Sequence, residues 1–324
     1  MALLSASDLR VAIGDVPILR GISLDVAEGE ALGIVGESGS GKSITARAMS
    51  RLLPAGAEVE GRVVFEGVSM LDADEQQLRG VRDKGMAMVF QDPRASINPV
   101  RKVGDFLIEA VCTNRGLDRA EARRRALEVL ETVRISRAES RLDAYPHQLS
   151  GGLLQRVMIA AALLSDPRLM IADEPTTALD VTTQAEIMAI LEELRAERGM
   201  ALILITHDLE LAAATTDRIA VMYAGEVVEF QGAAELIDDP QHPYTSALLA
   251  ARPSIERRID RLPAIPGRAL PTGEEVSGCR FADRCPLVIE RCRAEHPPLE
   301  PHADGLARCF RPGEVDDRLL ARSS

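Results

Sequence analysis

Apolar residues along the first 232 positions fall into short runs that alternate with longer stretches of helical spacing. The runs at 31–35, 169–172 and 201–205 contain no charged or polar side chain, which is the pattern of strands buried on both faces. Between about 93 and 164 the spacing becomes helical, and one face of its second half gathers Ala122, Ala126, Leu127, Leu130 and Val133. Strands that alternate with helices predict an α/β fold with a largely parallel sheet.

Turn residues mark the ends of several predicted strands. Residues 1–35 read as short strands with turns at Gly14-Asp15 and Glu28-Gly29, and "EGRVVFEGVSM" reads as a strand pair. The segment "KGMAMVFQD" predicts a buried strand that ends at Gln91, and residues 217–232 predict a β-hairpin around Ala224-Gly225.

The character of the chain changes after Gly232. Most of the 18 prolines and four of the five cysteines lie beyond that residue. We therefore expect two domains: an α/β domain at 1–232, with a helical subdomain at about 93–164, and a C-terminal extension at 233–324.

Composition narrows the class of protein. A hydrophobic content of 46% is typical of a globular protein with a real core, and the net charge of −12 argues against a nucleic-acid-binding surface. No apolar run approaches the roughly 18–20 residues of a membrane-spanning helix. The first residues, "MALLSASDLRVAIGD", lack the basic and apolar regions of a signal peptide, so we expect a cytosolic protein with reduced cysteines.

The stretch "GESGSGKS", residues 36–43, has the spacing G-x-x-x-x-G-K-[ST] between a predicted strand and a predicted helix. Glycines let backbone N–H groups converge on an anion, and the helix start adds its dipole. A lysine reaches the β- and γ-phosphates as a point charge, and the following serine is the usual Mg²⁺ ligand. The residues expected to hold ATP phosphates are Gly36, Ser38, Gly39, Ser40, Gly41, Lys42 and Ser43, the last as a Mg²⁺ ligand.

Two further motifs fit the same chemistry. The segment "LMIADEP" places Asp173 at the end of a buried strand, where a Mg²⁺ partner is expected, and Glu174 next to it, where it can polarise the attacking water. The segment "LSGGLLQR" opens a helix with Ser150, Gly151 and Gly152, which makes a second phosphate-ready helix N-terminus. One chain hardly needs two such termini for one nucleotide, so two subunits are expected to sandwich two ATP molecules.

Together with Gln91, Ala178-Leu179-Asp180 and His207, these motifs resemble the ATPase subunit of an ABC transporter over residues 1 to about 232. The resemblance implies a P-loop (RecA-like) ABC ATPase core with an antiparallel β subdomain and an α-helical signature subdomain. It also implies roles for single residues: Gln91 contacts Mg²⁺ and water, Ser150 and Gly152 touch the γ-phosphate of the ATP held by the opposite subunit, Asp180 reaches across the dimer, and His207 hydrogen-bonds the γ-phosphate.

One position departs from the family pattern. The family often stacks adenine on an aromatic residue about 23 positions before the first P-loop glycine, where this chain has Ile13. Isoleucine covers the base but lacks a π-face. We therefore expect Ile13 to contact adenine without stacking.

The segments "FQDPRASINP", "HPYTSALL" and "GCRFADRCPLVIERC" resemble the oligopeptide/dipeptide importer branch of the family. This resemblance implies an ATPase on the cytoplasmic face of the membrane that powers peptide import. Its implied partners are a second ABC ATPase subunit, two transmembrane permease subunits, which contact about residues 92–109, and an extracytoplasmic peptide-binding protein, with no nucleic acid.

Other members of the branch leave the cargo open, since nickel chelates and glutathione are alternative solutes. A soluble, non-transport ABC ATPase is a further alternative. The gap from Gly36 to Ser150 leaves no room for the long coiled coil of the chromosome and repair types. A binding-only subunit is disfavoured by the intact Lys42, Asp173, Glu174 and His207.

The extension carries Cys279, Cys285, Cys292 and Cys309 with the spacing C-x5-C-x6-C-x16-C. Spacing alone leaves open unrelated structural thiols, and also zinc, although zinc sites usually include a closer C-x2–4-C pair. In the importer branch the matching motif is associated with an iron–sulfur cluster. The resemblance therefore implies a [4Fe–4S] cluster with these four ligands, in a structural or regulatory role.

Overall fold

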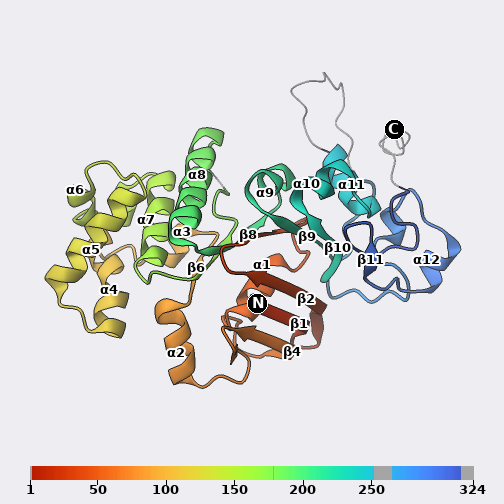
Figure 1. The fold of residues 1–324 in the computed structure, drawn as a ribbon, viewed down its shortest axis with the longest axis horizontal. Helices are drawn as coiled ribbons and strands as arrows, with labels where there is room; N and C mark the ends of the chain where they lie inside the picture. Colours follow the sequence, from red (N-terminus) through yellow and green to blue (C-terminus); the bar gives the residue numbers. More distant parts are fainter. Residues whose placement is uncertain (1, 178, 252–264, 315–324) are drawn as a thin grey trace. The chain divides into compact units, whose positions relative to one another are not determined.

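The computed structural model of the chain describes residues 2–177, 179–251 and 265–314. The described chain divides into two compact units. The first unit is built mainly from Glu66–Ile205, and the second from Leu4–Asp25, Ala31–Phe65 and the chain from Thr206 onward. Figure 1 shows the elements of both units and labels most of them.

The first unit has a parallel sheet with the strand order β8-β7-β6. Strands β7 and β8 are buried along their whole lengths, which agrees with their unbroken apolar sequences. The strands are β5 (Val68–Ser69), β6 (Met86–Val89), β7 (Leu169–Asp173) and β8 (Ala201–Thr206). The helices are α2 (Glu75–Lys84), α3 (Pro93–Ser96), α4 (Val103–Arg115), α5 (Arg119–Thr132), α6 (Ala138–Leu142), the 3-10 turn η1 (Pro146–Gln148), α7 (Gly151–Leu163) and α8 (Val181–Arg198).

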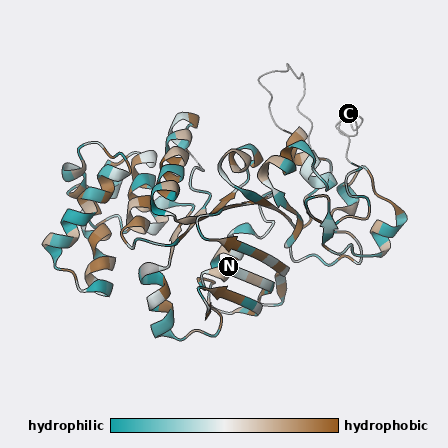
Figure 2. Cartoon of the chain, viewed as in Figure 1, coloured by the Kyte–Doolittle hydropathy of each residue, from teal (hydrophilic) through white to brown (hydrophobic). Residues whose placement is uncertain are grey.

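The expected helical subdomain consists of α3 to α7. Ala122, Ala126 and Leu130 of α5 are buried as expected, whereas Leu127 is only half-buried at the edge of the same face. Figure 2 shows these helices alternating between hydrophilic and hydrophobic residues, as amphipathic helices do. The sequence reading missed α2, which is polar and contains Gly80, but whose N-terminus is fixed by a capping box between Asp74 and Gln77.

The second unit contains two sheets. An antiparallel sheet has the order β2-β1-β4, with β1 and β2 joined through the predicted turn at Gly14-Asp15. A mixed sheet has the order β11-β12-β10-β9-β3, in which only the β3–β9 pair is parallel. The strands are β1 (Ala2–Ile13), β2 (Val16–Ala27), β3 (Ala31–Val35), β4 (Ala57–Phe65), β9 (Arg218–Tyr223), β10 (Glu226–Gly232), β11 (Glu300–His302) and β12 (Gly305–Ala307).

Short helices complete the second unit, and the predicted hairpin around Ala224-Gly225 is confirmed as the β9–β10 pair. The helices are α1 (Lys42–Met49), α9 (Leu209–Thr215), α10 (Ala233–Asp238), α11 (Pro243–Ala250), the 3-10 turn η2 (Ala282–Arg284) and α12 (Glu290–Ala294). The sequence reading did not anticipate that the extension adds β12 to the edge of β10, with Phe230 opposite Leu306.

The C-terminal extension shares the hydrophobic core of the second unit. Tyr223 of β9, Tyr244 of α11 and Phe281 are each no more than 2% exposed. Their ring centroids lie 4.8 to 5.3 Å apart, which is the range of favourable aromatic pairs. The extension therefore packs into the same core as the strand that neighbours β3.

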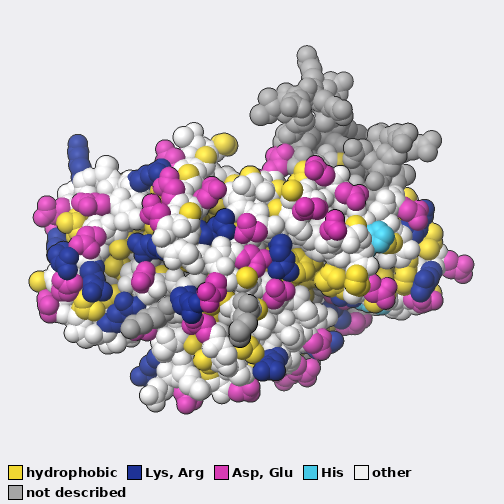
Figure 3. All heavy atoms as spheres, viewed as in Figure 1, with side chains coloured by type: hydrophobic (Ala, Val, Ile, Leu, Met, Phe, Trp, Pro, Cys, Tyr) yellow, Lys and Arg dark blue, Asp and Glu magenta, His cyan; other side chains and the backbone are white. Residues whose placement is uncertain are grey.

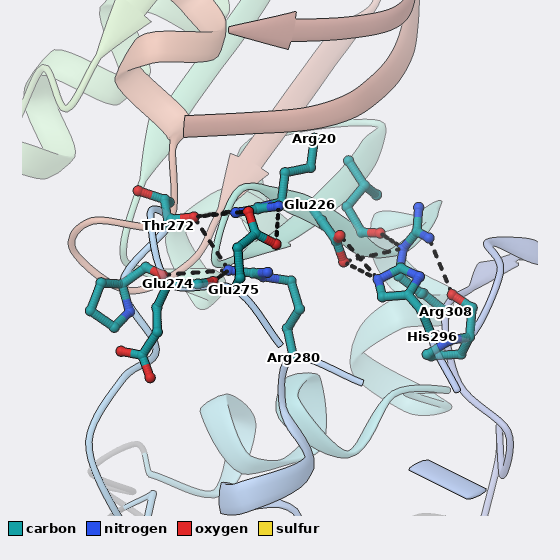
Figure 4. Close-up of polar contacts among 11 residues, drawn as sticks. Arg20, Glu226, Thr272, Glu274, Glu275, Arg280, His296 and Arg308 are labelled. Carbon is teal, nitrogen blue, oxygen red and sulfur yellow. Dashed lines mark hydrogen bonds and ion pairs between the residues drawn. The ribbon is translucent and has the colours of Figure 1, made fainter. Parts of the chain in front are cut away.

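Polar contacts at three places fasten the extension to strands of the same unit (Figure 4). Arg20 of β2 donates to the Thr272 carbonyl oxygen at 3.0 Å and to Glu275 at 2.6 Å. Glu226 of β10, which is nearly buried, lies 3.0 Å from His296. Arg308 donates from its backbone to the Val228 carbonyl oxygen at 2.8 Å. These bonds hold both ends of the cysteine-bearing segment.

Charged side chains of both signs are mixed on the face that Figure 3 draws. Figure 3 shows acidic and basic side chains interspersed on the visible face, so neither sign dominates there. Within the described ranges, no helix is both long enough and apolar enough to cross a membrane.

Candidate nucleotide-binding site

The P-loop connects the buried strand β3 to helix α1, as the motif requires. Gly41 caps the helix with a φ of 104°, and a Cβ atom there would lie 2.8 Å from the Leu19 side chain. Gly39 has a φ of 80° with open space where its Cβ would be. These conformations favour glycine, and they leave the hollow of the loop free of side chains.

Polar groups inside the loop are arranged around its backbone. The Lys42 side chain is 5% exposed, and its ammonium donates to the carbonyl oxygens of Gly36 at 2.8 Å and Glu37 at 2.9 Å. The hydroxyl of Ser40 is buried and has no hydrogen-bond partner among the described residues. A lysine folded against its own loop and an unpaired buried hydroxyl fit a loop that binds an anion.

The acidic pair lies at the end of β7 in the first unit. Asp173 is 1% exposed, and Glu174 has a φ of 47°, an uncommon conformation for a residue with a side chain. One oxygen of the Glu174 carboxylate accepts hydrogen bonds from the Gln91 amide at 2.9 Å and from the Thr177 hydroxyl at 2.8 Å. The structure thus brings Gln91 and Glu174 together from the ends of neighbouring parallel strands.

Sequence reasoning missed Thr177 as part of this group. The strained backbone of Glu174 and the two donors fix the direction of its carboxylate. The sequence "DEPTT" could have indicated this contact, because it places a hydroxyl residue three positions after the glutamate.

The signature motif and Asp180 meet at a second location in the first unit. Ser150 caps α7 and accepts from the Leu153 N–H at 3.3 Å, while Asp180 caps α8 and accepts from Thr183. Hydrogen bonds from Thr183 hold the pKa of Asp180 below its usual value, so this carboxylate is ionised. Both helix starts line one hollow of about 390 Å³, together with Arg134 and Arg156.

A side chain on Gly152 would not fit this hollow. A Cβ atom there would lie 2.6 Å from the Thr183 methyl group. The absence of a side chain lets α7 and α8 approach each other at their N-termini, where both dipoles point toward the hollow.

The remaining predicted residues of the site lie in the second unit. His207 directly follows β8 and is exposed, and Ile13 ends β1, where it is half-buried opposite Ala57. The P-loop, His207 and Ile13 thus share one unit, whereas Gln91, Asp173, Glu174, Ser150, Gly152 and Asp180 share the other.

The four cysteines of the extension gather around one small apolar cavity. Cys279, Cys285, Cys292 and Cys309 line it together with His242 and other residues. Burial raises the pKa of Cys279 to about 11 and that of Cys285 to about 12, so both are thiols at neutral pH when no cation is bound.

The cysteine geometry does not by itself form a metal site. Across the described residues, no group of three or more His, Cys, Asp or Glu side chains is placed to hold a metal ion. The iron–sulfur part of the sequence prediction is therefore not supported by this structure, although the four predicted ligands do lie around one cavity.

Comparisons with known proteins match both parts of the chain. The ABC transporter family matches residues 19–177, and the family described as oligopeptide/dipeptide transporter, C-terminal region, matches residues 228–292. Among solved structures, the ATP-binding cassette MJ0796 in a dimeric post-hydrolysis state with ADP and Pi is 31% identical with a TM-score of 0.63, over 71% of this chain and 98% of that one. The protein cbiO1 from Clostridium perfringens, part of the complex cbiONQ, is 29% identical with a TM-score of 0.63, over 74% of this chain and 91% of that one.

Curated relatives match almost the entire length. A probable peptide ABC transporter ATP-binding protein of Sinorhizobium fredii is 48% identical over 92% of this chain and 90% of its own. The dipeptide transport ATP-binding protein DppD of Escherichia coli is 45% identical over 98% of each chain, and the oligopeptide protein OppD of the same species is 43% identical over 97% and 94%. The predicted ABC ATPase fold is confirmed, and the chain belongs to the ATP-binding proteins of ABC transporters, in the oligopeptide/dipeptide branch.

Proposed function

We propose that this chain is the ATP-hydrolysing subunit that powers import of oligopeptides or dipeptides by a multi-subunit ABC transporter. The observation that carries the proposal is that one chain joins a P-loop cassette to a peptide-transporter C-terminal region, with relatives 43 to 48% identical over more than nine-tenths of its length. Nickel chelates and glutathione are the alternative cargoes.

At the nucleotide, we assign the phosphates to the P-loop residues Gly36, Ser38, Gly39, Ser40, Gly41, Lys42 and Ser43. Ser43, Asp173 and Gln91 are the proposed Mg²⁺ ligands. The metal would neutralise charge that develops on the phosphates. Ile13 is proposed to cover adenine, and His207 to hydrogen-bond the γ-phosphate.

Glu174 is the proposed catalytic base. Donors from Gln91 and Thr177 hold its carboxylate in one direction, and we assign this carboxylate to the attacking water. Orientation of water is most of what a protein contributes to this reaction.

A second ABC ATPase, identical or homologous, is the proposed partner in hydrolysis. Ser150, Gly152 and Asp180 line a hollow at two helix N-termini, which suits the phosphate of an ATP held by the partner. Two transmembrane permease subunits and an extracytoplasmic peptide-binding protein complete the proposed transporter, with this chain peripheral on the cytoplasmic face of the membrane. The division of the chain into 1–232 and 233–324 stays part of the proposal.

Reconstitution tests the proposed function. The chain would be co-expressed with the products of neighbouring genes, purified from membranes as a complex, and placed in liposomes with labelled peptides. We expect ATP-dependent peptide uptake that Lys42→Ala abolishes while the complex remains assembled. Uptake of a nickel chelate or glutathione without peptide uptake would favour the alternative cargo, and a chain that never associates with membrane subunits would contradict the transport role.

We also retain the [4Fe–4S] cluster as a proposal, with Cys279, Cys285, Cys292 and Cys309 as ligands. Its support is that all four cysteines line one cavity. Protein purified without oxygen is expected to be brown, to absorb near ~400 nm and to contain about four irons per chain. Colourless protein with one bound zinc would contradict the cluster, and protein with four freely titrating thiols would contradict any metal site.

A further inference from the structure

The second residue of the P-loop, Glu37, is bound by the C-terminal extension. Its carboxylate accepts two parallel hydrogen bonds from the Arg284 guanidinium, Nη1 to Oε2 at 2.6 Å and Nη2 to Oε1 at 3.0 Å. Its backbone N–H donates to the Tyr244 hydroxyl at 2.8 Å. A residue of the phosphate-binding loop is thus held at both its backbone and its side chain by residues more than 200 positions away.

Contacts other than Glu37 also hold the Arg284 side chain in place. Its side chain is 5% exposed, and its Nε donates to the Pro266 carbonyl oxygen at 2.9 Å. Its Nη1 also donates to the Tyr223 hydroxyl at 3.3 Å, and the guanidinium lies beside the Tyr223 and Phe281 rings. A planar fork held in this way suits a bidentate bond to a carboxylate, and lysine does not reproduce that geometry.

The backbone that carries Arg284 belongs to the cysteine loop, residues 279–292. Arg284 ends the turn η2 and directly precedes Cys285. The Ala282 N–H donates to the Cys279 carbonyl oxygen at 3.0 Å, and the Cys279 N–H donates to the Cys292 carbonyl oxygen at 2.7 Å. A rearrangement of the cysteines therefore moves the backbone from which Arg284 extends.

The charges explain why the contact matters for a nucleotide. A carboxylate in a loop that binds phosphates repels them, and the repulsion is strong where water is partly excluded. Arg284 cancels that charge, because a guanidinium is always protonated in proteins and this one is bonded to both oxygens of the Glu37 carboxylate. Removing one partner of such a pair leaves a poorly solvated charge without compensation.

We propose that Arg284 is a positioning residue of the nucleotide site, and that through the Arg284–Glu37 pair the cysteine loop and the P-loop are energetically coupled. The inference rests on the proposed function only in that ATP binds the P-loop. Coupling between two sites is reciprocal, so a nucleotide at the P-loop must also change the behaviour of the cysteines.

The first test is a double-mutant cycle on the full chain, with the dissociation constant of a fluorescent ATP analogue and Mg²⁺ as the readout. Arg284→Met is expected to weaken binding by about 5- to 150-fold, the usual range of coupling between sites. Glu37→Gln combined with Arg284→Met is expected to restore most of the affinity, because no charge is then left unpaired. Arg284→Lys is expected to fall between wild type and Arg284→Met.

Arg293→Met is the matched control. Arg293 lies in the same segment beside Cys292, but it is exposed and pairs with Asp283 at 2.6 Å. Its replacement is expected to leave nucleotide affinity unchanged. Equal affinities of wild type and Arg284→Met, or a double variant as weak as Arg284→Met, would overturn the inference, whereas a wild type that binds no ATP would overturn the proposed function instead.

The second test reads the cysteines directly and does not depend on ATP hydrolysis. The full chain would be purified with a metal chelator, so that the four thiols are unligated, and treated with a maleimide. Modification of each cysteine would be followed by mass spectrometry with and without a non-hydrolysable ATP analogue. The nucleotide is expected to slow modification of Cys279 and Cys285 in wild type and in Arg293→Met, but not in Arg284→Met. Cys112, outside the cysteine loop, serves as the internal reference. A nucleotide effect that persists in Arg284→Met would refute the coupling.

Discussion

At the scale of single residues, the proposed catalysis depends on the direction of one carboxylate. Glu174 has a positive φ, and its side chain is held by Gln91 and Thr177. A residue held in a sparsely populated conformation at the end of a buried strand is typical of an active site, where surrounding contacts maintain the strain.

Glu174→Gln is expected to keep ATP binding and to lower turnover by about 10²-fold or more, because glutamine accepts hydrogen bonds but cannot take a proton from water. Thr177→Val is a useful companion, since it removes one donor and leaves the base in place, and it should reduce turnover less. Steady-state phosphate release together with ATP affinity checks both variants. Near-normal hydrolysis by Glu174→Gln would reject its role as base.

Ile13 lies at the end of β1, where the family pattern places an aromatic residue. Ile13→Tyr is expected to tighten ATP binding by the value of one stacking contact, ~0.5–1.5 kcal/mol, while Ile13→Leu should change little. Titration with a labelled nucleotide measures both. Equal affinities for the tyrosine and leucine variants would mean that adenine is held elsewhere.

At the scale of elements, helix N-termini define the two halves of each proposed nucleotide site. Helix α1 starts within the P-loop at Lys42, and α7 and α8 start at the hollow lined by Ser150 and Asp180. If each site combines α1 of one subunit with α7 of its partner, two variants that are inactive alone can form an active site when they are mixed.

A Lys42→Ala subunit mixed with a Ser150→Arg subunit is expected to recover about one competent site per dimer, because each variant keeps the half that the other lacks. Each variant alone should be inactive, with unchanged circular dichroism. If the natural partner is a different ATPase, the two changes are placed on the two different chains. Persistent inactivity of the well-folded mixture would argue against shared sites.

Motifs at strand ends could be predicted because each is local. Each motif lies at the end of one strand or the start of one helix, as the P-loop, Asp173-Glu174 and "LSGG" do. The spacing of its residues in the sequence is therefore enough to predict its local structure. The same holds for the turns at Gly14-Asp15 and Ala224-Gly225, where glycine marks the change of direction.

Other features depend on contacts that local spacing does not encode. Arg284 contacts Glu37 although the two residues are 247 positions apart in the sequence. From the sequence alone, each reads as one more charged residue exposed to solvent. Helix α2 has few apolar residues, and β12 is only three residues long, too short for a period to be seen. The paired neighbour, rather than the segment's own sequence, determines the structure there.

At the scale of the whole molecule, the C-terminal extension is more than an addition to a finished cassette. It supplies Phe281 to a core shared with Tyr223, and it binds β2 through Arg20. Proline and cysteine content rises after Gly232, but no boundary between compact units lies there. The chain on both sides of Gly232 belongs to the second unit.

Strand β12 has one more consequence, which concerns solubility. Where β12 pairs with it, β10 has no free backbone edge, and the β11–β12 hairpin that provides the cover is short. A chain cut after residue 232 would present the buried strand β10 as an open edge, the kind of surface on which sheets of separate molecules join. We expect this truncated chain to aggregate during size-exclusion chromatography, whereas a chain ending at residue 314 stays monodisperse. The hairpin thus acts as a cap against self-association.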